Sequence, residues 1–177
     1  MALRSTPHHY GVVAVTLHWL SALLILVLIG SGFRAAGADD ATQKAAVLRA
    51  HIPLGITILV LTLARVGWWI FADAKPSPVS MPSWQARTSR AVQVLFYVVI
   101  LGMAASGIGM MILSGAGPII FGGDVSALAS FWDYRPRGPH GIGARIMLAL
   151  FVLHTGAALY HQFVKKDGLM RRMWFSR

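Results

Sequence analysis

Four long apolar segments constrain the fold of this chain more than any other feature. They cover residues 12–33, 51–71, 91–113 and 141–164. Each has about 20 residues or slightly more, enough for an α-helix to cross the ~30 Å hydrocarbon layer of a membrane. Only helices and closed β-barrels satisfy their backbone hydrogen bonds in lipid, and these segments lack the alternation of barrel strands. The sequence therefore predicts an all-α fold, an integral membrane four-helix bundle.

The composition supports one membrane domain over residues 1–177. Hydrophobic residues make up 56% of the chain and charged residues 12%, whereas soluble domains carry about 25% charged residues. The absence of cysteine excludes disulfides, thiol catalysis and thiolate metal ligands. The formal net charge of +10 lies at the ends of the apolar segments. Membrane anchoring is therefore favoured, and no nucleic-acid partner is expected.

The connections between the segments differ in length and charge. Residues 34–50 are predicted to be a short polar loop, residues 72–90 an extended linker, and residues 114–139 the longest loop, with a short interfacial helix at SALASFWDY. Lysine and arginine are concentrated in the N-terminus, the 72–90 linker and the C-terminal tail, whereas the other two connections hold fewer, offset by four aspartates. The positive-inside rule then places both termini in the cytoplasm. In a bacterium the chain would be a multi-pass inner-membrane protein, with the other two connections facing the periplasm.

Histidines within the apolar segments are the main candidates for function, because ionisable groups are costly in lipid. No Asp or Glu lies in any segment, so these imidazoles are expected to be neutral and to bind a metal. His140 and His154 are fourteen residues apart, which places them within roughly 40° on one helix face and about 21 Å apart. His161 lies ~10 Å from His154 along the helix axis, which is too close for two large metal centres, and ~31 Å from His140, which is the full thickness of the hydrocarbon layer. The spacing of fourteen residues therefore best suits two stacked metal centres.

Partners for these two histidines come from other helices at matching depths. His51 is predicted to face His140, and His18 to face His154. Two imidazoles undercoordinate zinc or copper but complete the axial ligands of porphyrin iron. Because the chain has no CxxCH motif, the expected cofactors are two non-covalent haem b groups with iron. The alternatives are isolated hydrogen bonds to backbone carbonyls, or a haem-free transporter that uses intramembrane histidines.

Arg65 is a candidate cofactor-binding residue. It lies fourteen residues after His51, on the same face of the second helix and one layer deeper. At that depth its guanidinium can pair with a haem propionate. The alternative is an arginine that extends its charged end to the membrane surface.

Three segments carry a resemblance to a known family. They are VTLHWLSALLIL around His18, the second helix with His51 and Arg65, and the C-terminal PHGIGARIMLALFVLHTGAALYHQFVKKDGLMRRM. Together they resemble the bacterial cytochrome b561 family over nearly the whole chain. The resemblance implies a four-helix membrane bundle with two b haems. By motif position it also implies the four ligands that the depth argument selects, namely His18, His51, His140 and His154.

The resemblance also implies an activity. The best understood type in that family is a superoxide oxidase, which passes an electron from superoxide through the haems to ubiquinone. This chain is accordingly expected to be an oxidoreductase in the lipid bilayer, with superoxide or another periplasmic donor and ubiquinone as its partners, and a homodimer as a further candidate assembly. The alternative is a haem-bearing membrane anchor that relays electrons for a separate dehydrogenase or hydrogenase.

Two groups of residues fit that activity. A quinone that takes two electrons needs two protons, and His161, close to Lys165 and Lys166, is the candidate catalytic residue that supplies a hydrogen bond or proton. The alternative is an ordinary surface histidine. Several arginines near the periplasmic ligands are candidates for steering the superoxide anion, namely Arg49, Arg135, Arg137 and Arg145.

Overall fold

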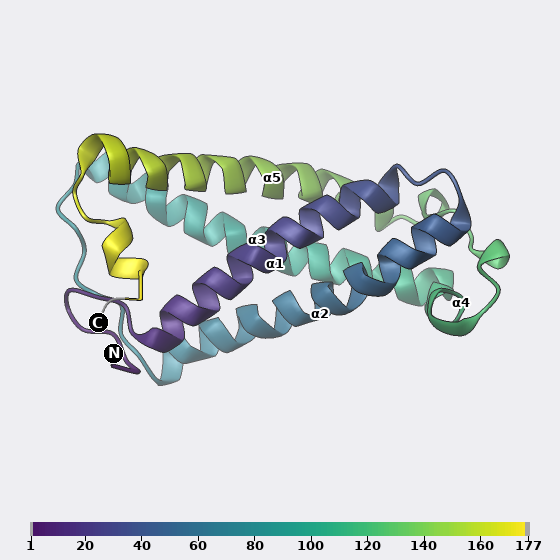
Figure 1. Ribbon diagram of the computed structural model, residues 1–177, viewed down its shortest axis with the longest axis horizontal. Helices are drawn as coiled ribbons and strands as arrows, with labels where there is room; N and C mark the ends of the chain where they lie inside the picture. Colours follow the sequence, from purple (N-terminus) through teal and green to yellow (C-terminus); the bar gives the residue numbers. More distant parts are fainter. Residues whose placement is uncertain (1, 176–177) are drawn as a thin grey trace.

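The protein is built from four long helices that run up and down the bundle in alternating directions, as Figure 1 shows. The computed structural model describes residues 2–175, so Met1, Ser176 and Arg177 of the predicted domain lie outside the described residues. All four helices are long and apolar enough to cross a membrane, which confirms the predicted all-α class. The elements are α1 (Val12–Ala36), α2 (Ala41–Phe71), α3 (Ser83–Ser114), α4 (Ala116–Gly122), η1 (Val125–Ala127), η2 (Phe131–Asp133), α5 (Arg137–Tyr160), η3 (His161–Lys165) and η4 (Met170–Met173).

Two of the long helices extend well beyond their apolar segments. α2 begins at Ala41, so most of the predicted loop 34–50 is helical, and the carboxylate of Asp40 caps the helix by accepting a backbone hydrogen bond at 2.8 Å. α3 begins at Ser83, inside the predicted linker 72–90. Both predicted boundaries were wrong because hydrophobicity marks only the part of a helix that suits lipid, whereas the helix continues until a cap or turn ends it.

The connection between α3 and α5 also differs from the prediction. Its helix is α4, upstream of SALASFWDY, and it packs through Ile120, which is fully buried. SALASFWDY itself forms only the short 3-10 turns η1 and η2 rather than one interfacial helix. The side-chain oxygens of Asp124 and Ser130 accept backbone hydrogen bonds at the starts of these turns. Such local side-chain bonds favour turns over a continuous helix.

The centre of the bundle is a layer of four buried apolar side chains, one from each long helix. They are Ile25, Ile58, Ile100 and Met147. On α5, Met147 lies seven residues after His140 and seven before His154. Since seven residues make almost two helical turns, the layer lies midway between the two levels at which the predicted histidine ligands lie.

The N-terminal segment, the α2–α3 connection and the C-terminal segment meet at one end of the bundle, here called the terminal end (Figure 1). Arg172 joins all three, because its guanidinium donates to the carbonyls of His8 at 2.9 Å and Ser77 at 2.8 Å. The indole of Trp19 donates to the carbonyl of Met173 at 2.8 Å. The opposite end, which carries α4, is called the distal end. The charge pattern predicts that these three segments lie on one side of the membrane, and the structure places them together. Their position on the cytoplasmic side stays a prediction.

Asp73 holds the N-terminal segment against the end of α2. Its carboxylate accepts hydrogen bonds from the backbone N–H of Ser5 at 2.9 Å, from the Ser5 hydroxyl at 2.7 Å and from the Trp68 indole at 3.1 Å. Burial acts to raise the pKa of Asp73, but these hydrogen bonds together outweigh it and hold the pKa below its usual value. The carboxylate therefore stays charged, and the segment docked, until the pH falls through that lowered pKa.

We expect Asp73→Ala to release this segment, so that trypsin cleaves the folded protein after Arg4 several-fold faster than it cleaves the wild type. Digestion time courses at neutral pH, analysed by intact mass, measure the rate. Asp39→Ala in the loop at the distal end is the control and should leave the rate unchanged. Equal cleavage of the Asp73 variant and the wild type would contradict the anchoring role.

Candidate functional site

Two pairs of histidines face each other across the bundle, and α5 contributes one member of each pair. At the distal level, the ring centroids of His51 on α2 and His140 are 6.3 Å apart, with their planes at 68°. At the terminal level, the centroids of His18 on α1 and His154 are 6.2 Å apart, with their planes at 66°. The structure thus brings together the members of each predicted pair, while their role as metal ligands stays a prediction.

The geometry of each pair fits one metal atom between two rings. A metal–nitrogen bond of about 2 Å on each side is compatible with centroids 6.2–6.3 Å apart. Within residues 2–175 no group of three or more His, Cys, Asp or Glu side chains gathers to hold an ion. A bare zinc or copper ion would therefore lack ligands, whereas porphyrin iron needs only the two axial nitrogens. The donor set fits a haem at each level.

Arg65 provides an independent test of that fit. Its Nε is buried and has no hydrogen-bond partner within the described part of the chain, although buried donors are almost always paired. Its guanidinium is close enough to His18 and His154 to affect both rings electrostatically. A buried guanidinium nitrogen without a partner, close to the terminal pair, suits a bound anionic group. The predicted pairing with a propionate fits this position and stays a prediction, as does the alternative of an arginine that extends to the membrane surface.

Two serines contact the distal pair and were missed by the sequence reasoning. The Ser31 hydroxyl on α1 lies 2.9 Å from Nδ1 of His51, and the Ser106 hydroxyl on α3 lies 2.9 Å from Nδ1 of His140. A glycine follows each serine, and each places its Cα beside the same imidazole. The available signal was this repeated Ser-Gly dipeptide in the first and third helices. This dipeptide does not indicate a contact with a histidine until it is known which helices lie side by side.

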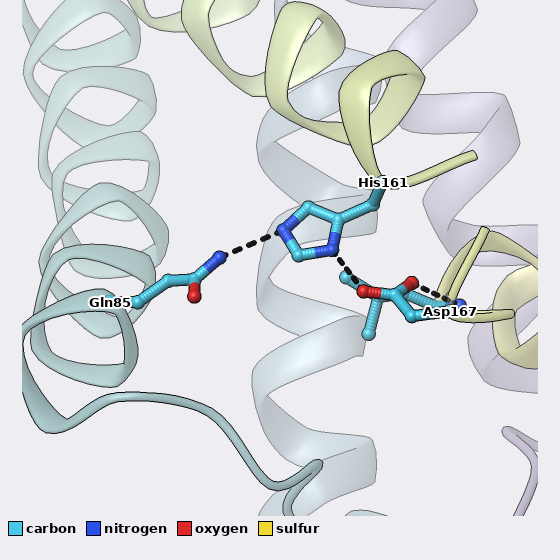
Figure 2. A network of polar contacts seen from close by, with 4 residues as sticks. Gln85, His161 and Asp167 are labelled. Atoms are coloured by element: carbon cyan, nitrogen blue, oxygen red, sulfur yellow. Dashed lines mark hydrogen bonds and ion pairs between the residues drawn. The ribbon is translucent and has the colours of Figure 1, made fainter. Parts of the chain in front are cut away.

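His161 lies apart from both pairs, at the point where α5 passes into the π-helical turn η3. Only 8% of its surface is exposed, so it is not an ordinary surface histidine. Figure 2 shows its ring between the carboxylate of Asp167 and the amide of Gln85. The Nδ1–Oδ2 distance to Asp167 is 2.5 Å, and Nε2 lies 3.0 Å from the Gln85 amide nitrogen. Because a carboxylate only accepts hydrogen bonds, the Nδ1–H group of His161 is the donor in the hydrogen bond to Asp167.

A chain reversal after η3 brings Asp167 back onto His161. Lys166 and Gly168 both have positive φ, at 53° and 75°, and glycine adopts this conformation without steric cost. The backbone N–H of Leu169 donates to the second oxygen of Asp167 at 3.1 Å and holds the carboxylate in place. The sequence reasoning missed this partner because the aspartate lies outside the apolar segment and its approach depends on the backbone turn.

The four predicted distal arginines do not form one cluster. Arg49 donates to a backbone carbonyl of α4 at 2.6 Å and so ties α2 to α4. Arg137 and Arg145 both approach Gly141, next to the distal pair, whereas Arg135 is exposed. Within residues 2–175, none of these arginines forms an ion pair with an aspartate. The positive charge near the distal pair is therefore less offset than the sequence suggested.

Comparison with known proteins agrees with this site. The sequence model of the family described as "prokaryotic cytochrome b561" matches residues 9–176 of this chain. The chain belongs to this family. Relatives include cytochrome b561 homolog 2 of Escherichia coli, 28% identical over 98% of this chain and 95% of the relative, and cytochrome b562 of Cereibacter sphaeroides, 29% identical over 93% and 94%. A third, the probable superoxide oxidase CybB of Yersinia pestis, is 25% identical over 93% and 94%.

Membership of the cytochrome b561 family confirms the coarse functional prediction. This protein is a bacterial membrane redox protein that takes part in electron transfer, and its family implies b-type haem as the cofactor. Its helices are suited to a lipid bilayer. The number of haems, the ligands, the electron donor and the electron acceptor belong to the proposal below.

Proposed function

We propose that this cytochrome b561 carries electrons across the bacterial inner membrane through two b haems, from superoxide or another periplasmic donor to ubiquinone. One observation supports the proposal above all others. Two pairs of facing imidazoles are separated by fourteen residues on α5, with the buried apolar layer midway between them. That arrangement provides two redox centres at two depths of one membrane. Both termini are then cytoplasmic, and the distal pair lies toward the periplasm.

The protein itself supplies position and insulation. His18 and His154 hold one group, His51 and His140 the other, and Arg65 neutralises an anionic substituent of the group at the terminal level. When bound, each haem accepts and gives up one electron at its iron. The apolar layer between the levels excludes water, so the side chains there offer no path for charged solutes through the bundle.

At the distal end, Arg137 and Arg145 favour an anionic donor. Their guanidinium groups approach the same turn of α5, one residue after His140. Positive charge near the entry point raises the local concentration of an anion such as superoxide and its rate of encounter. This electrostatic attraction is expected to weaken as ionic strength rises.

At the terminal end, His161 is placed to supply protons to a quinone. Two superoxide anions lose one electron each and become two molecules of oxygen; ubiquinone gains the two electrons and two protons and becomes ubiquinol. Asp167 holds the His161 ring so that Nε2 points toward Gln85 (Figure 2). An imidazole held in this way can relay a proton from water to a quinone oxygen that takes the place of the Gln85 amide.

The proposal is tested by spectroscopy and stopped-flow kinetics on the purified protein. We expect a reduced-minus-oxidised b-type spectrum with two haems per chain, rapid reduction by superoxide, and reoxidation that depends on added ubiquinone. A preparation with one haem per chain would overturn the two-centre arrangement. Two haems without reduction by superoxide or reoxidation by quinone would instead favour the membrane-anchor alternative, which needs a partner enzyme.

A further inference from the structure

The two histidine pairs have different surroundings, and the difference lies at the Nδ1 atoms. In the distal pair, each ring has a serine hydroxyl 2.9 Å from Nδ1, Ser31 for His51 and Ser106 for His140. In the terminal pair, no hydrogen bond joins the ring of His18 or His154 to another residue between residues 2 and 175. Trp19 lies beside His18, Phe96 beside His154, and Arg65 near both rings.

The same local structure occurs twice at the distal level. A Cβ added to Gly32 would lie 3.2 Å from Cε1 of His51, and one added to Gly107 would lie 3.4 Å from Cε1 of His140. Each imidazole therefore lies directly against a glycine, with its Nδ1 directed at the preceding serine. A Cβ at Gly32 would require the His51 ring to shift slightly, whereas one at Gly107 would be at the edge of ordinary van der Waals contact with His140. Two unrelated helices, α1 and α3, thus build equivalent supports for the two distal rings.

The direction of these hydrogen bonds follows from where the serine protons go. The Ser31 hydroxyl donates to the carbonyl of Val27 at 2.7 Å, and the Ser106 hydroxyl donates to the carbonyl of Met103 at 3.0 Å. A hydroxyl has one proton, so each oxygen is left to accept from the imidazole. Nδ1–H is then the donor in both distal rings, and each Nε2 keeps its lone pair free for a metal.

The geometry points to Ser31 and Ser106 as positioning residues that lower the reduction potential of the distal haem. This inference rests on the two-haem arrangement proposed above. A hydrogen bond donated from Nδ1 makes the ring a more basic ligand. A more basic ligand stabilises the oxidised iron more than the reduced iron, and hydrogen bonding around the ligands is a recognised means of setting haem potentials. The terminal pair lacks this bond and lies beside the cation of Arg65, which stabilises the reduced state instead.

This asymmetry favours transfer from the distal to the terminal haem. Arg137 is close enough to His140 to act in the opposite direction, but its guanidinium lies over the exposed ring of Trp132 at 4.2 Å, where water screens its charge. The two serine bonds act on the ligands themselves. They therefore help to place the distal haem at the lower potential, so that an electron from the periplasmic side moves toward the quinone side spontaneously.

The test is a redox titration of the purified, haem-loaded protein, followed in the visible spectrum. We expect Ser31→Ala and Ser106→Ala each to raise the lower of the two midpoint potentials and to leave the higher one unchanged. The expected rise corresponds to an increase of up to about tenfold in the reduced-to-oxidised ratio, or about 59 mV for a one-electron couple. Ser31→Thr and Ser106→Thr keep the hydroxyl and should restore the wild-type potential.

Two controls separate this effect from general changes in the bundle. Thr57→Ala removes a hydroxyl whose one hydrogen bond among residues 2–175 goes to a carbonyl of its own helix, at 2.9 Å, and should change neither potential. Arg65→Met should lower the higher potential and leave the lower one unchanged, which identifies the two components. An unchanged lower potential in both alanine variants, or an equal shift of both components, would overturn the inference. Loss of the distal haem that threonine does not restore would also overturn it, whereas one haem in the wild type would refute the proposed function itself.

Discussion

Replacing His154 by alanine should reduce the haem content from two per chain to one. His154 is the α5 member of the terminal pair, and its ring lies 6.2 Å from that of His18. Without it, the terminal haem would have one axial ligand in place of two and would lose the stabilisation that ligand binding gives the fold. Haem extraction with pyridine, together with the reduced-minus-oxidised spectrum, measures the loss. We expect the remaining spectrum to be that of the distal haem.

His161→Ala is the matched control, because it removes a histidine seven residues further along the chain, at the start of η3. That variant should keep two haems and a wild-type spectrum. Two low-spin haems in the His154 variant would contradict the assignment of the terminal ligand. Reduction by superoxide should persist in the His154 variant, since the distal pair is unchanged, whereas electron delivery to quinone should stop.

Replacing His161 by alanine should slow quinone reduction by about 100-fold or more, the usual contribution of a positioned acid–base group, with both haem bands intact. The loss is expected because the ring that Asp167 and Gln85 hold in place is no longer there to relay a proton. The measurement is the rate of reoxidation by ubiquinone after rapid reduction. Loss of either haem from this variant would show a structural role and would contradict the assignment to the quinone site.

Asp167→Asn separates the charge of this site from its shape. Burial acts to raise the pKa of Asp167, but hydrogen bonds from His161 and Leu169 and the nearby positive charge of Lys165 outweigh it and hold the pKa below its usual value. The carboxylate is therefore charged at neutral pH, and its contribution to holding His161 is lost only as the pH falls through that lowered pKa.

For the asparagine variant we expect quinone reduction about tenfold slower than in the wild type, a smaller loss than in His161→Ala. The rate should also lose the acid-side decline that protonation of Asp167 causes in the wild type. Rates measured down to and below pH 3.8, the ordinary pKa of an aspartate side chain, provide this comparison. An asparagine variant with the wild-type rate and the wild-type pH profile would show that the carboxylate has no part in proton supply.

The histidine pairs could be predicted because helical geometry converts residue number into depth and direction. A spacing of fourteen on one helix, together with the positions of His18 and His51 in two others, is enough to predict which rings face each other. The prediction succeeded since the apolar segments leave few alternatives to straight helices that cross a membrane. Helix ends were harder to predict. They depend on caps such as Asp40, which hydrophobicity does not detect.

The sequence alone determined the number of membrane-crossing helices, the two histidine levels, the isolated position of His161 and the family of the protein. The family follows from a resemblance in quoted motifs, whereas the other features depend on local periodicity and composition, which every helix carries within itself. Only the tertiary structure decided which hydroxyls contact the distal imidazoles and which carboxylate holds His161. Ser31 and Ser106 acquire their role from helices that pack beside the ligands, and Asp167 from a backbone reversal. Contacts between separate elements require the packed bundle, because nothing in the spacing along one helix specifies its neighbour.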